Sequence, residues 1–519
     1  MLKHGGDPVA HLLHRVIVAT WQSGKAPKAW KRAVLTYLYK GKGPRLSSHS
    51  YRGISLLSVC SKVYVNILIA RLRPTLSPSL HEAQGGFRAG RGTIDQIFSM
   101  RRLSELSHAY KRPLYAAFID YSKAFDCINR EALWAMLANR HVDPHLIDLV
   151  KDLYDGCEGE VVVQGSRSQP FPMRTGVRQG CALSPMLFNV YIDHIARTAL
   201  DTPDMVALGF PFAYAIDGQL HPPLPLSAHA STVTVGRITF LMYADDIVLL
   251  ADSREGLTAL MQRLETVSTD WAMTLNYDKT QAMVFHPDIP PHLHPTLPIA
   301  PTTATPSTQL PAPISLTRGS IKFVASFCYL GSVLAADGSL DNEMKARMGK
   351  TRAALQQLVA AWRHRHIPLY IKMMVYRAIG PPTLLYGAET WPITPQQLHQ
   401  LDVMQNDCLR MILGVRRADR VPIADLRHDC MDQPGMEQLV AQCHMRAIGH
   451  YARRPEYRIC KQLLFAKCVP GTHGAPRQAR NNLITTYRNC LEQHGVLQDF
   501  LVKAQTRATW RGIIAHGAH

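Results

Sequence analysis

Two apolar segments that meet at a pair of adjacent carboxylates restrict the possible folds of this 519-residue chain more than any other feature. The segment 238–252 reads ITFLMYADDIVLLAD, with strand-like apolar residues on both sides of Asp245 and Asp246. This pattern predicts a β-hairpin with the two acids at its tip. An isolated Asp-Asp pair usually marks only a turn, but carboxylates at the ends of buried strands repel one another unless a cation lies between them. Hard oxygen ligands of this kind suit Mg²⁺.

A third carboxylate follows another strand-like run. Residues 114–119 form a short apolar segment that ends at Asp120, and polar residues then lead into a helical pattern. Two or three aspartates on neighbouring strands can bridge two metal ions roughly 4 Å apart, which is the arrangement that nucleotidyl transfer requires. We therefore expect Asp120, Asp245 and Asp246 to hold two Mg²⁺ ions, with Mn²⁺ as an alternative.

A glycine-bracketed loop lies between these two segments in the chain. In RTGVRQGCALSPMLFNVYIDHI (174–195), Gly176 and Gly180 enclose Val-Arg-Gln, and Ser184-Pro185 begins an apolar helix. Glycines allow the backbone and Gln179 to approach a ligand closely, although an ordinary strand-to-helix turn would look the same. Taken alone, this loop does not distinguish a ligand-binding site from an ordinary turn.

The charge of the chain favours a polyanionic partner. The sequence holds 58 Lys and Arg against 39 Asp and Glu, a net charge of +19 at pH 7. Basic residues gain affinity for nucleic acid by neutralising phosphates and releasing counterions.

The 11 cysteines include no CxxC pair, which argues against a zinc ribbon. No signal peptide or run of about 20 apolar residues is present, so we expect a protein of the nucleus or cytoplasm with no membrane partner.

Three motifs, and the order in which they follow one another along the chain, resemble those of a known family. FIDYSKAFD (118–126), GVRQGCALSPMLFN (176–189) and YADD (243–246) resemble the palm motifs of reverse transcriptases from non-LTR, LINE-like retrotransposons. Further segments from about residue 20 to 455 resemble the fingers motifs, the next palm motif, the primer grip, a thumb motif and a tail element of that family. They are 51–74, GGFRAGRGTIDQIF (85–98), WAMTLNYDKTQAMVF (271–285), FCYLGSVL (327–334), LLYGAETW (384–391) and GHYARRP (449–455).

The resemblance implies a role for each matching residue. Asp120 and Asp245 would bridge the metal ions, with Asp246 as a neighbouring acid of lesser role. Phe125 would be the steric gate that excludes a 2′-hydroxyl; without the resemblance it would read as a core aromatic. Gln179 would contact the incoming nucleotide.

Basic residues and the primer grip complete the implied site. Arg52 and Lys40 would meet the triphosphate or the template, and Lys279 would protonate the departing pyrophosphate, unless it is simply a surface lysine. The primer end would be positioned by Tyr329, Leu330 and Gly331. The implied partners are an RNA template, a DNA primer or target, and dNTPs.

The expected fold is an α+β right-hand polymerase with an antiparallel-sheet palm, helical fingers and a helical thumb. Strands are expected at 114–119, 160–163 and 238–251, and helices at 55–73, 94–106, 344–362, 371–379, 395–413 and 434–451. The expected units are fingers (1–110), palm (111–286) with an irregular insertion at 210–230, a flexible Pro/Thr-rich insertion (287–318), primer grip (319–336), thumb (337–455) and a basic helical tail (456–519).

Two alternatives remain open. An RNA-dependent RNA polymerase or intron-maturase relative would share the palm, but Phe125 and the 85–98 motif argue against it. A catalytically inactive, RNA-binding remnant is the other, and the intact acids and glycine loop argue against it. No endonuclease-like sequence precedes the polymerase motifs, so the chain is also expected to be a fragment of a longer element protein.

Overall fold

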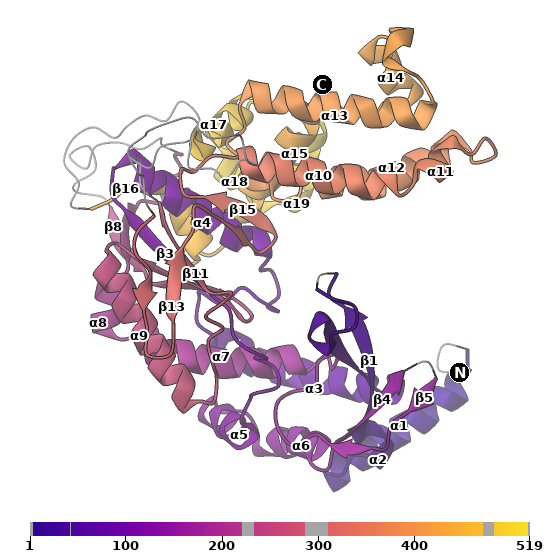
Figure 1. Ribbon diagram of the computed structural model, residues 1–519, viewed down its shortest axis with the longest axis vertical. Helices are drawn as coiled ribbons and strands as arrows, with labels where there is room; N and C mark the ends of the chain where they lie inside the picture. Colours follow the sequence, from indigo (N-terminus) through magenta and orange to yellow (C-terminus); the bar gives the residue numbers. More distant parts are fainter. Residues whose placement is uncertain are drawn as a thin grey trace.

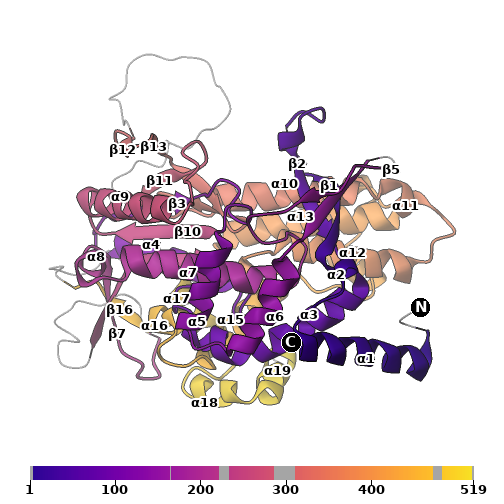
Figure 2. The ribbon, with the colours of Figure 1, turned by 90° about the horizontal axis from the view of Figure 1, so that it is seen from below.

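The computed structural model describes residues 4–41, 43–163, 165–220, 233–285, 310–470 and 482–516. Its elements follow an arc with a mixed sheet in the middle, an N-terminal lobe at one end and a bundle of long helices at the other (Figure 1). Helix α1 (Gly6–Ser23) lies at the far end of the N-terminal lobe in both views (Figures 1 and 2). This is the fingers, palm and thumb order of a right-hand polymerase.

The palm is built on a six-stranded sheet. Its strands, in spatial order, are β12 (Ile314–Ser315), β13 (Ser320–Phe323), β11 (Gln281–Phe285), β3 (Leu114–Ile119), β10 (Asp246–Ala251) and β9 (Phe240–Tyr243). All neighbouring pairs are antiparallel except β11 with β13, which are parallel. The predicted antiparallel palm is therefore confirmed, apart from this one pair. Strand β9 is the edge strand on the side of the predicted acidic turn.

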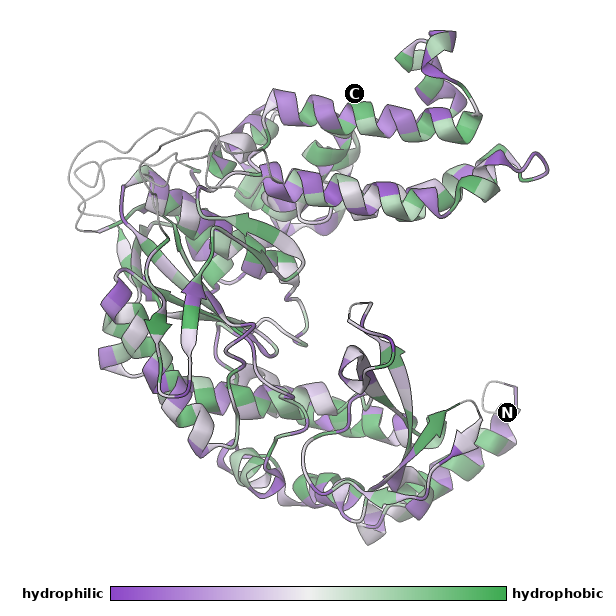
Figure 3. Cartoon of the chain, viewed as in Figure 1, coloured by the Kyte–Doolittle hydropathy of each residue, from purple (hydrophilic) through white to green (hydrophobic). Residues whose placement is uncertain are grey.

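Both faces of the palm sheet are covered, because alternate side chains of a strand point to opposite faces. Ile119, Ile247 and Leu249 belong to a core with the helices α7 (Ser184–Leu200) and α9 (Arg254–Asp270). Phe118 and Val248 belong to a second core with α4 (Thr93–Ala109) and C-terminal helices. The continuous apolar strands are visible between these layers (Figure 3). Burial on both faces explains why the strands read as apolar runs rather than as alternating patterns.

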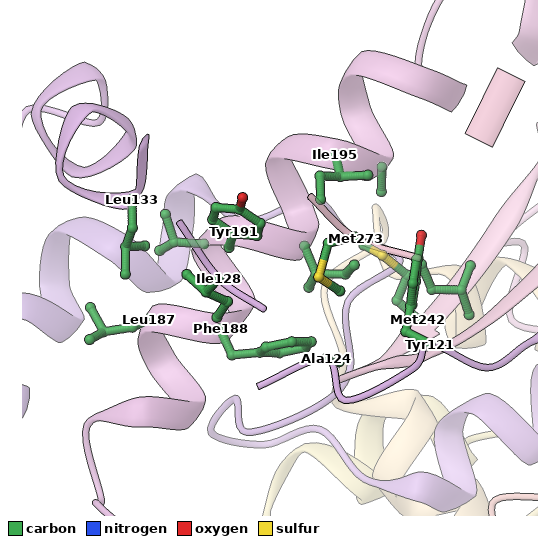
Figure 4. Close-up of a cluster of buried hydrophobic side chains, with 14 of the residues drawn as sticks. Tyr121, Ala124, Ile128, Leu133, Leu187, Phe188, Tyr191, Ile195, Met242 and Met273 are labelled. Carbon is green, nitrogen blue, oxygen red and sulfur yellow. The ribbon is translucent and has the colours of Figure 1, made fainter. Parts of the chain in front are cut away.

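The first core extends beneath the loop that follows Asp120. It includes Ile128, Leu187, Phe188, Tyr191 and Met273, several of which come from α7. Figure 4 shows part of this cluster at close range. Packing of this loop onto a largely buried helix fixes the backbone on which the Asp120 segment rests.

The fingers lobe contains a sheet that the sequence did not predict. Strand β1 pairs antiparallel with β2 and parallel with β4, and β5 and β6 complete the sheet. The helices of this region fold beside it. The elements are α2 (Lys28–Lys31), β1 (Arg32–Tyr39), β2 (Tyr51–Leu56), α3 (Val59–Ser79), α5 (Arg130–Asn139), α6 (Pro144–Tyr154), β4 (Glu158–Val163), β5 (Ser166–Arg167) and β6 (Phe171–Pro172). The fingers, expected to be mostly helical, thus also contain strands, and strands from the region 158–172 pair with the fingers rather than with the palm sheet.

Helix α3 continues past the position where it was expected to end. It contains Pro74 and Pro78, although proline removes a helical hydrogen bond. Leu72 and Leu76 are both buried on the same helix, and their packing holds the last turns in place.

The thumb is a helical bundle with a core of its own, as predicted. The two long helices α10 and α12 lie beside α13 (Figure 1). The bundle comprises α10 (Asp341–Gln356), α11 (Val359–Arg363), α12 (Leu369–Leu384), α13 (Pro395–Leu413) and α14 (Ile423–Asp429). Helix α13 has the predicted bounds, and its Thr394-Pro395-Gln396-Gln397 start forms a capping box.

The C-terminal region packs onto the palm rather than extending from the thumb. Helix α16 packs on α4, the Tyr451 ring of α15 contacts Phe98 of α4, and β16 pairs with β7, which pairs with β8. The elements are β7 (Phe210–Tyr214), α8 (Pro203–Ala207), β8 (Thr234–Ile238), α15 (Met436–Ala452), α16 (Ile459–Leu464), β16 (Ala466–Cys468), α17 (Leu483–Gln493), α18 (Phe500–Gln505) and α19 (Arg507–His516). The start of the expected irregular insertion, 210–214, is therefore a strand.

Parts of two expected insertions fall on residues 221–232 and 286–309, which lie outside the described residues. None of the helices within the described ranges combines the length and the apolar character needed to cross a membrane.

Candidate active site

Asp120 lies directly after the central palm strand β3, where the segment 274–280 runs alongside it. The Asp120 amide donates to Thr280 Oγ1 at 3.2 Å, and the Asn276 amide donates to the Asp120 carbonyl at 2.8 Å. The Ser122 amide donates to the Thr274 carbonyl at 2.9 Å. These bonds fix the backbone on both sides of Asp120, so the position of its carboxyl group at the end of β3 is also fixed.

Asp245 and Asp246 occupy the predicted hairpin tip. Tyr243 pairs with Asp246, which leaves Ala244 and Asp245 as a two-residue turn. Ala244 has a φ of +58°, a left-handed conformation that costs a non-glycine residue roughly 1–2 kcal/mol. Ile247 pairs with Ile119, and this register continued by one step places Asp246 opposite Asp120. The fold thus brings the three predicted carboxylates to one end of two adjacent strands.

The pKa values of the hairpin acids show that the carboxylates affect one another. Burial raises the pKa of Asp245, Asp120 raises it further, and Arg52 and Lys279 oppose the shift. The pKa of Asp246 rises to about 6, because the surrounding protein partly removes the carboxyl from water and because Asp245 and Asp120 add negative charge. The site therefore concentrates negative charge that a cation would relieve.

Lys279 is close to this cluster. Its ammonium forms an ion pair with Asp120 Oδ2 at 3.1 Å, although the lysine side chain is 62% exposed. The lysine therefore takes part in the carboxylate cluster instead of lying apart on the surface.

The glycine loop packs against the segment that carries Phe125. The Val177 amide donates to the Phe125 carbonyl at 2.8 Å. Gly176 has a φ of +72°, and a Cβ there would lie 2.6 Å from the same carbonyl oxygen, so this close approach requires glycine. The Phe125 ring stacks on Phe188 with centroids 4.5 Å apart and planes 5° apart. Stacking on a fully buried ring restricts the rotation of Phe125.

The glycine loop also joins the palm to the fingers. The Ser55 amide of β2 donates to the Gln179 carbonyl at 2.6 Å, and Gly180, with a φ of +109°, lies against the Ser55 carbonyl. Arg52 lies on the same strand and is exposed, within electrostatic range of Asp245. Lys40 directly follows Tyr39, which pairs with Tyr51, so it lies at the same end of this hairpin as Arg52, and its ammonium donates to the His49 carbonyl at 2.7 Å. The structure thus brings Arg52 to the acids but leaves Lys40 at the fingers tip.

The predicted primer grip is a tight hairpin beside the carboxylates. Strands β14 (Ser326–Tyr329) and β15 (Ser332–Ala335) are joined by Leu330 and Gly331, both with positive φ. Phe327 of β14 stacks on Phe118 of the palm sheet at 4.1 Å between centroids. Tyr329 is buried, and its hydroxyl lies within electrostatic range of Asp246.

The thumb motif supports this hairpin, which sequence reasoning did not foresee. Tyr386 of LLYGAETW donates its hydroxyl hydrogen to the Leu330 carbonyl at 2.8 Å, and its oxygen also lies 3.1 Å from Thr93 Oγ1 of α4. Arg347 of α10 donates to the Gly331 carbonyl. The resemblance identifies this motif, but the partners of Tyr386 lie 56 residues or more away in the chain, and no local pattern indicates them.

The chemistry of the donor set fits divalent metal ions, which the reverse transcriptase family generally uses. Within the described ranges, no three His, Cys, Asp or Glu side chains are gathered closely enough to enclose an ion already. Asp120, Asp245 and Asp246 nevertheless offer six carboxylate oxygens, and removal from water, together with their mutual repulsion, raises the pKa of the two hairpin acids. Oxygen-rich sites of this kind suit Mg²⁺ or Mn²⁺.

Neutralising Asp246 is expected to stabilise the metal-free protein at neutral pH. The folded-state pKa of about 6 exceeds the usual value, so folding opposes ionisation of this carboxyl as the pH rises. Asp246→Asn should therefore melt at a higher temperature than the wild type above pH 6, and the difference should shrink as the pH falls towards about 4. The gain should be small because the side chain is solvent-exposed. Thermal denaturation in EDTA across this pH range would measure it; an equal or lower melting temperature at neutral pH would contradict the expectation.

Comparisons with known proteins agree with this geometry. A family model described as "Reverse transcriptase (RNA-dependent DNA polymerase)" matches residues 40–333. The chain is 29% identical over 398 residues to the probable RNA-directed DNA polymerase from transposon BS of Drosophila melanogaster, covering 74% of this chain and 38% of that protein. It is 24% identical over 420 residues to the RNA-directed DNA polymerase from mobile element jockey of the same organism, covering 79% and 40%.

A solved structure of apo telomerase from Candida tropicalis has a TM-score of 0.41 and 10% identity, covering 89% of this chain and 75% of that one. The chain spans less than half the length of the transposon BS and jockey proteins. The family match covers more than half of this chain and includes all three acids. The chain therefore belongs to the reverse transcriptase family, within the LINE-like group of non-LTR retrotransposon enzymes.

Proposed function

We propose that this chain is the RNA-directed DNA polymerase of a non-LTR retrotransposon, which extends a DNA primer on an RNA template. The observation that carries the proposal is the convergence of Asp120, Asp245 and Asp246 at one end of β3 and β10, beside the Phe125 loop and the primer-grip hairpin. Two divalent ions held by these carboxylates would activate the primer 3′-hydroxyl and neutralise the triphosphate.

The chain's own residues would prepare the substrates. Arg52, which faces the acids from the fingers, would bind the triphosphate, and Gln179 would lie under the incoming nucleotide. Lys279, now paired with Asp120, would hold a proton near the departing pyrophosphate. Lys40 would contact the template from the fingers tip. Leu330 and Gly331, which Tyr386 and Arg347 hold from the thumb, would fix the primer end together with Tyr329.

The thumb would hold the template–primer duplex by its phosphates. Its helices α10 to α12 expose several cations, which suit an A-form duplex recognised by shape rather than by base edges. These residues are Lys345, Lys350, Arg352, Arg363, Arg365 and Arg377. Nuclear work on chromosomal DNA would follow from the proposed activity.

Primer extension tests the proposal directly. The full chain is expected to add dTMP to oligo-dT on poly-rA in the presence of Mg²⁺, and to lose this activity in EDTA. A folded protein that incorporates no nucleotide with either Mg²⁺ or Mn²⁺ would overturn the proposed activity and support the remnant alternative.

Replacing Phe125 is expected to weaken discrimination against ribonucleotides. Phe125→Ala removes the stacked ring that would occupy the space of a 2′-hydroxyl. Steric selection of this kind contributes roughly 10- to 200-fold. The ratio of kcat/KM for dTTP to kcat/KM for UTP should therefore decrease by about that factor in Phe125→Ala. Single-nucleotide extension measures both values. Tyr37→Ala, which removes an exposed aromatic of the fingers, serves as the control and should leave the ratio unchanged. An unchanged ratio in Phe125→Ala would remove the gate assignment.

A further inference from the structure

A loop from the fingers–palm junction lies along the outer edge of the hairpin that carries Asp245 and Asp246. Residues 83–86 run beside the edge strand β9, where the Met242 amide donates to the Ala83 carbonyl at 3.0 Å and the Gly85 amide donates to the Met242 carbonyl at 2.8 Å. Gln96 of α4 joins the same strand, because its Nε2 donates to the Ala83 and Met242 carbonyls. The loop therefore closes an edge that the sheet leaves unpaired.

The side chain of Gln84 reaches beyond this edge to the turn that carries the acids. Its Oε1 accepts from the Ala244 amide at 2.9 Å and from the Gly86 amide at 2.8 Å. Its Nε2 lies 3.4 Å from the Ala244 carbonyl. Gln84 has no exposed surface. One side chain thus binds both backbone groups of the residue immediately before Asp245.

Ala244 is also the strained residue of the turn. Its φ of +58° is unfavourable for alanine, so contacts outside the hairpin must help to hold it. Gly86 permits the close approach, because a Cβ there would lie 2.3 Å from the Ala244 amide nitrogen. Asn189 of α7 fixes Gly86 in turn by donating to its carbonyl at 2.7 Å.

The far side of the same loop is anchored by an ion-pair cluster with the C-terminal region. Glu82 pairs with Arg91 at 2.6 Å and with Arg458 at 2.7 Å. Arg458 and His450 also contact Asp95 of α4, at 3.4 Å and 2.8 Å. These groups are largely buried, so the loop cannot move away from β9 without breaking them. The GHYARRP segment, which contains His450, thus has a structural role behind the active site.

We infer that Gln84 is a positioning residue, which holds the Ala244–Asp245 turn in the conformation that presents the carboxylates to the metal ions. The inference rests on the proposed function only for its catalytic consequence, since the contact with the turn is a property of the fold. A residue that orients metal ligands in this way typically changes metal affinity or activity by about 10- to 100-fold when it is removed.

The test compares two buried glutamines that contact the same hairpin. Gln84→Met keeps the length of the side chain but removes the bonds to Ala244, whereas Gln96→Met removes bonds to Ala83 and Met242 only. We expect faster amide hydrogen exchange at residues 243–246 in Gln84→Met and not in Gln96→Met. We also expect the Mg²⁺ concentration for half-maximal primer extension to rise by about 10- to 100-fold in Gln84→Met, with the KM for dTTP at saturating Mg²⁺ little changed.

Each outcome decides the inference. Wild-type exchange at the turn, or a wild-type Mg²⁺ requirement, in folded Gln84→Met would overturn it. Equal effects in Gln96→Met would also overturn it, because loss of general packing would then suffice. Should Gln84→Met fail to fold, Gln84→Asn, which stays polar but is too short to reach the Ala244 amide, replaces it with the same expectations. If the wild type extends no primer, the proposed function fails. The role of Gln84 is then decided by two other measurements: amide hydrogen exchange at residues 243–246, and Mn²⁺ binding followed by electron paramagnetic resonance.

Discussion

Primer extension by the Asp245→Asn protein is expected to fall by about three orders of magnitude or more, because a charge-stabilising metal contributes several kcal/mol to the transition state. Asp245 sits in the hairpin turn, where burial and Asp120 raise its pKa and the opposing cations are Arg52 and Lys279. An amide in its place keeps the size of the side chain but supplies no negative charge to bind the ions. Single-turnover extension on a poly-rA template measures the loss directly.

The folded state itself should survive this change. Removing a carboxyl whose pKa is raised by burial and by Asp120 relieves repulsion, so the metal-free Asp245→Asn protein should melt no lower than the wild type at pH 7. Asp270→Asn makes the same substitution at an exposed position at the end of α9 and should retain wild-type extension. Activity of Asp245→Asn equal to that of Asp270→Asn would exclude Asp245 as a metal ligand.

The parts of the site that the sequence predicts are those determined by local patterns. Strand β3 has the predicted bounds, and the hairpin places Asp245 and Asp246 at its tip, because buried strands and turn residues leave clear marks in a sequence. Helix α13 also begins and ends as predicted, since its proline start and capping box are local signals. The order of the three palm motifs then sufficed to identify the family.

The parts that the sequence does not predict depend on tertiary contacts. The fingers sheet joins β1 to β4, more than 120 residues later; β1 does not alternate clearly enough to be recognised alone, and the strand expected at 160–163 gives no sign of its partner. Gln84 precedes a recognised motif, but its function depends on Ala244, 160 residues away. The C-terminal helices read simply as basic and helical, whereas their apolar faces cover α4. Periodicity reports that a face is buried, but it does not report which element covers it.

The hairpin of the predicted primer grip depends on a buried carboxylate that none of the motifs indicated. Glu343 of α10 is fully buried, and its oxygens accept from Arg347 Nε at 2.8 Å and from the Val333 amide of β15 at 2.6 Å. It also opposes the effect of burial on Arg101, whose pKa falls to about 10. Arg101 in turn donates to Ser332 Oγ at 3.1 Å. One carboxylate thus compensates two buried guanidinium groups at the junction of palm, primer grip and thumb.

Glu343→Ala is therefore expected to lower the free energy of unfolding by about 3–5 kcal/mol, because removing one partner leaves buried charges uncompensated. Denaturant unfolding followed by circular dichroism would measure this loss. Glu343→Gln, which keeps an oxygen acceptor for the Val333 amide, should lose less, and Lys345→Ala, at an exposed position on the same helix, should be nearly neutral. If Glu343→Ala were as stable as Lys345→Ala, the two arginines would have to be solvated without the carboxylate. The junction would then be open to water, and the primer grip could not owe its position to this ion pair.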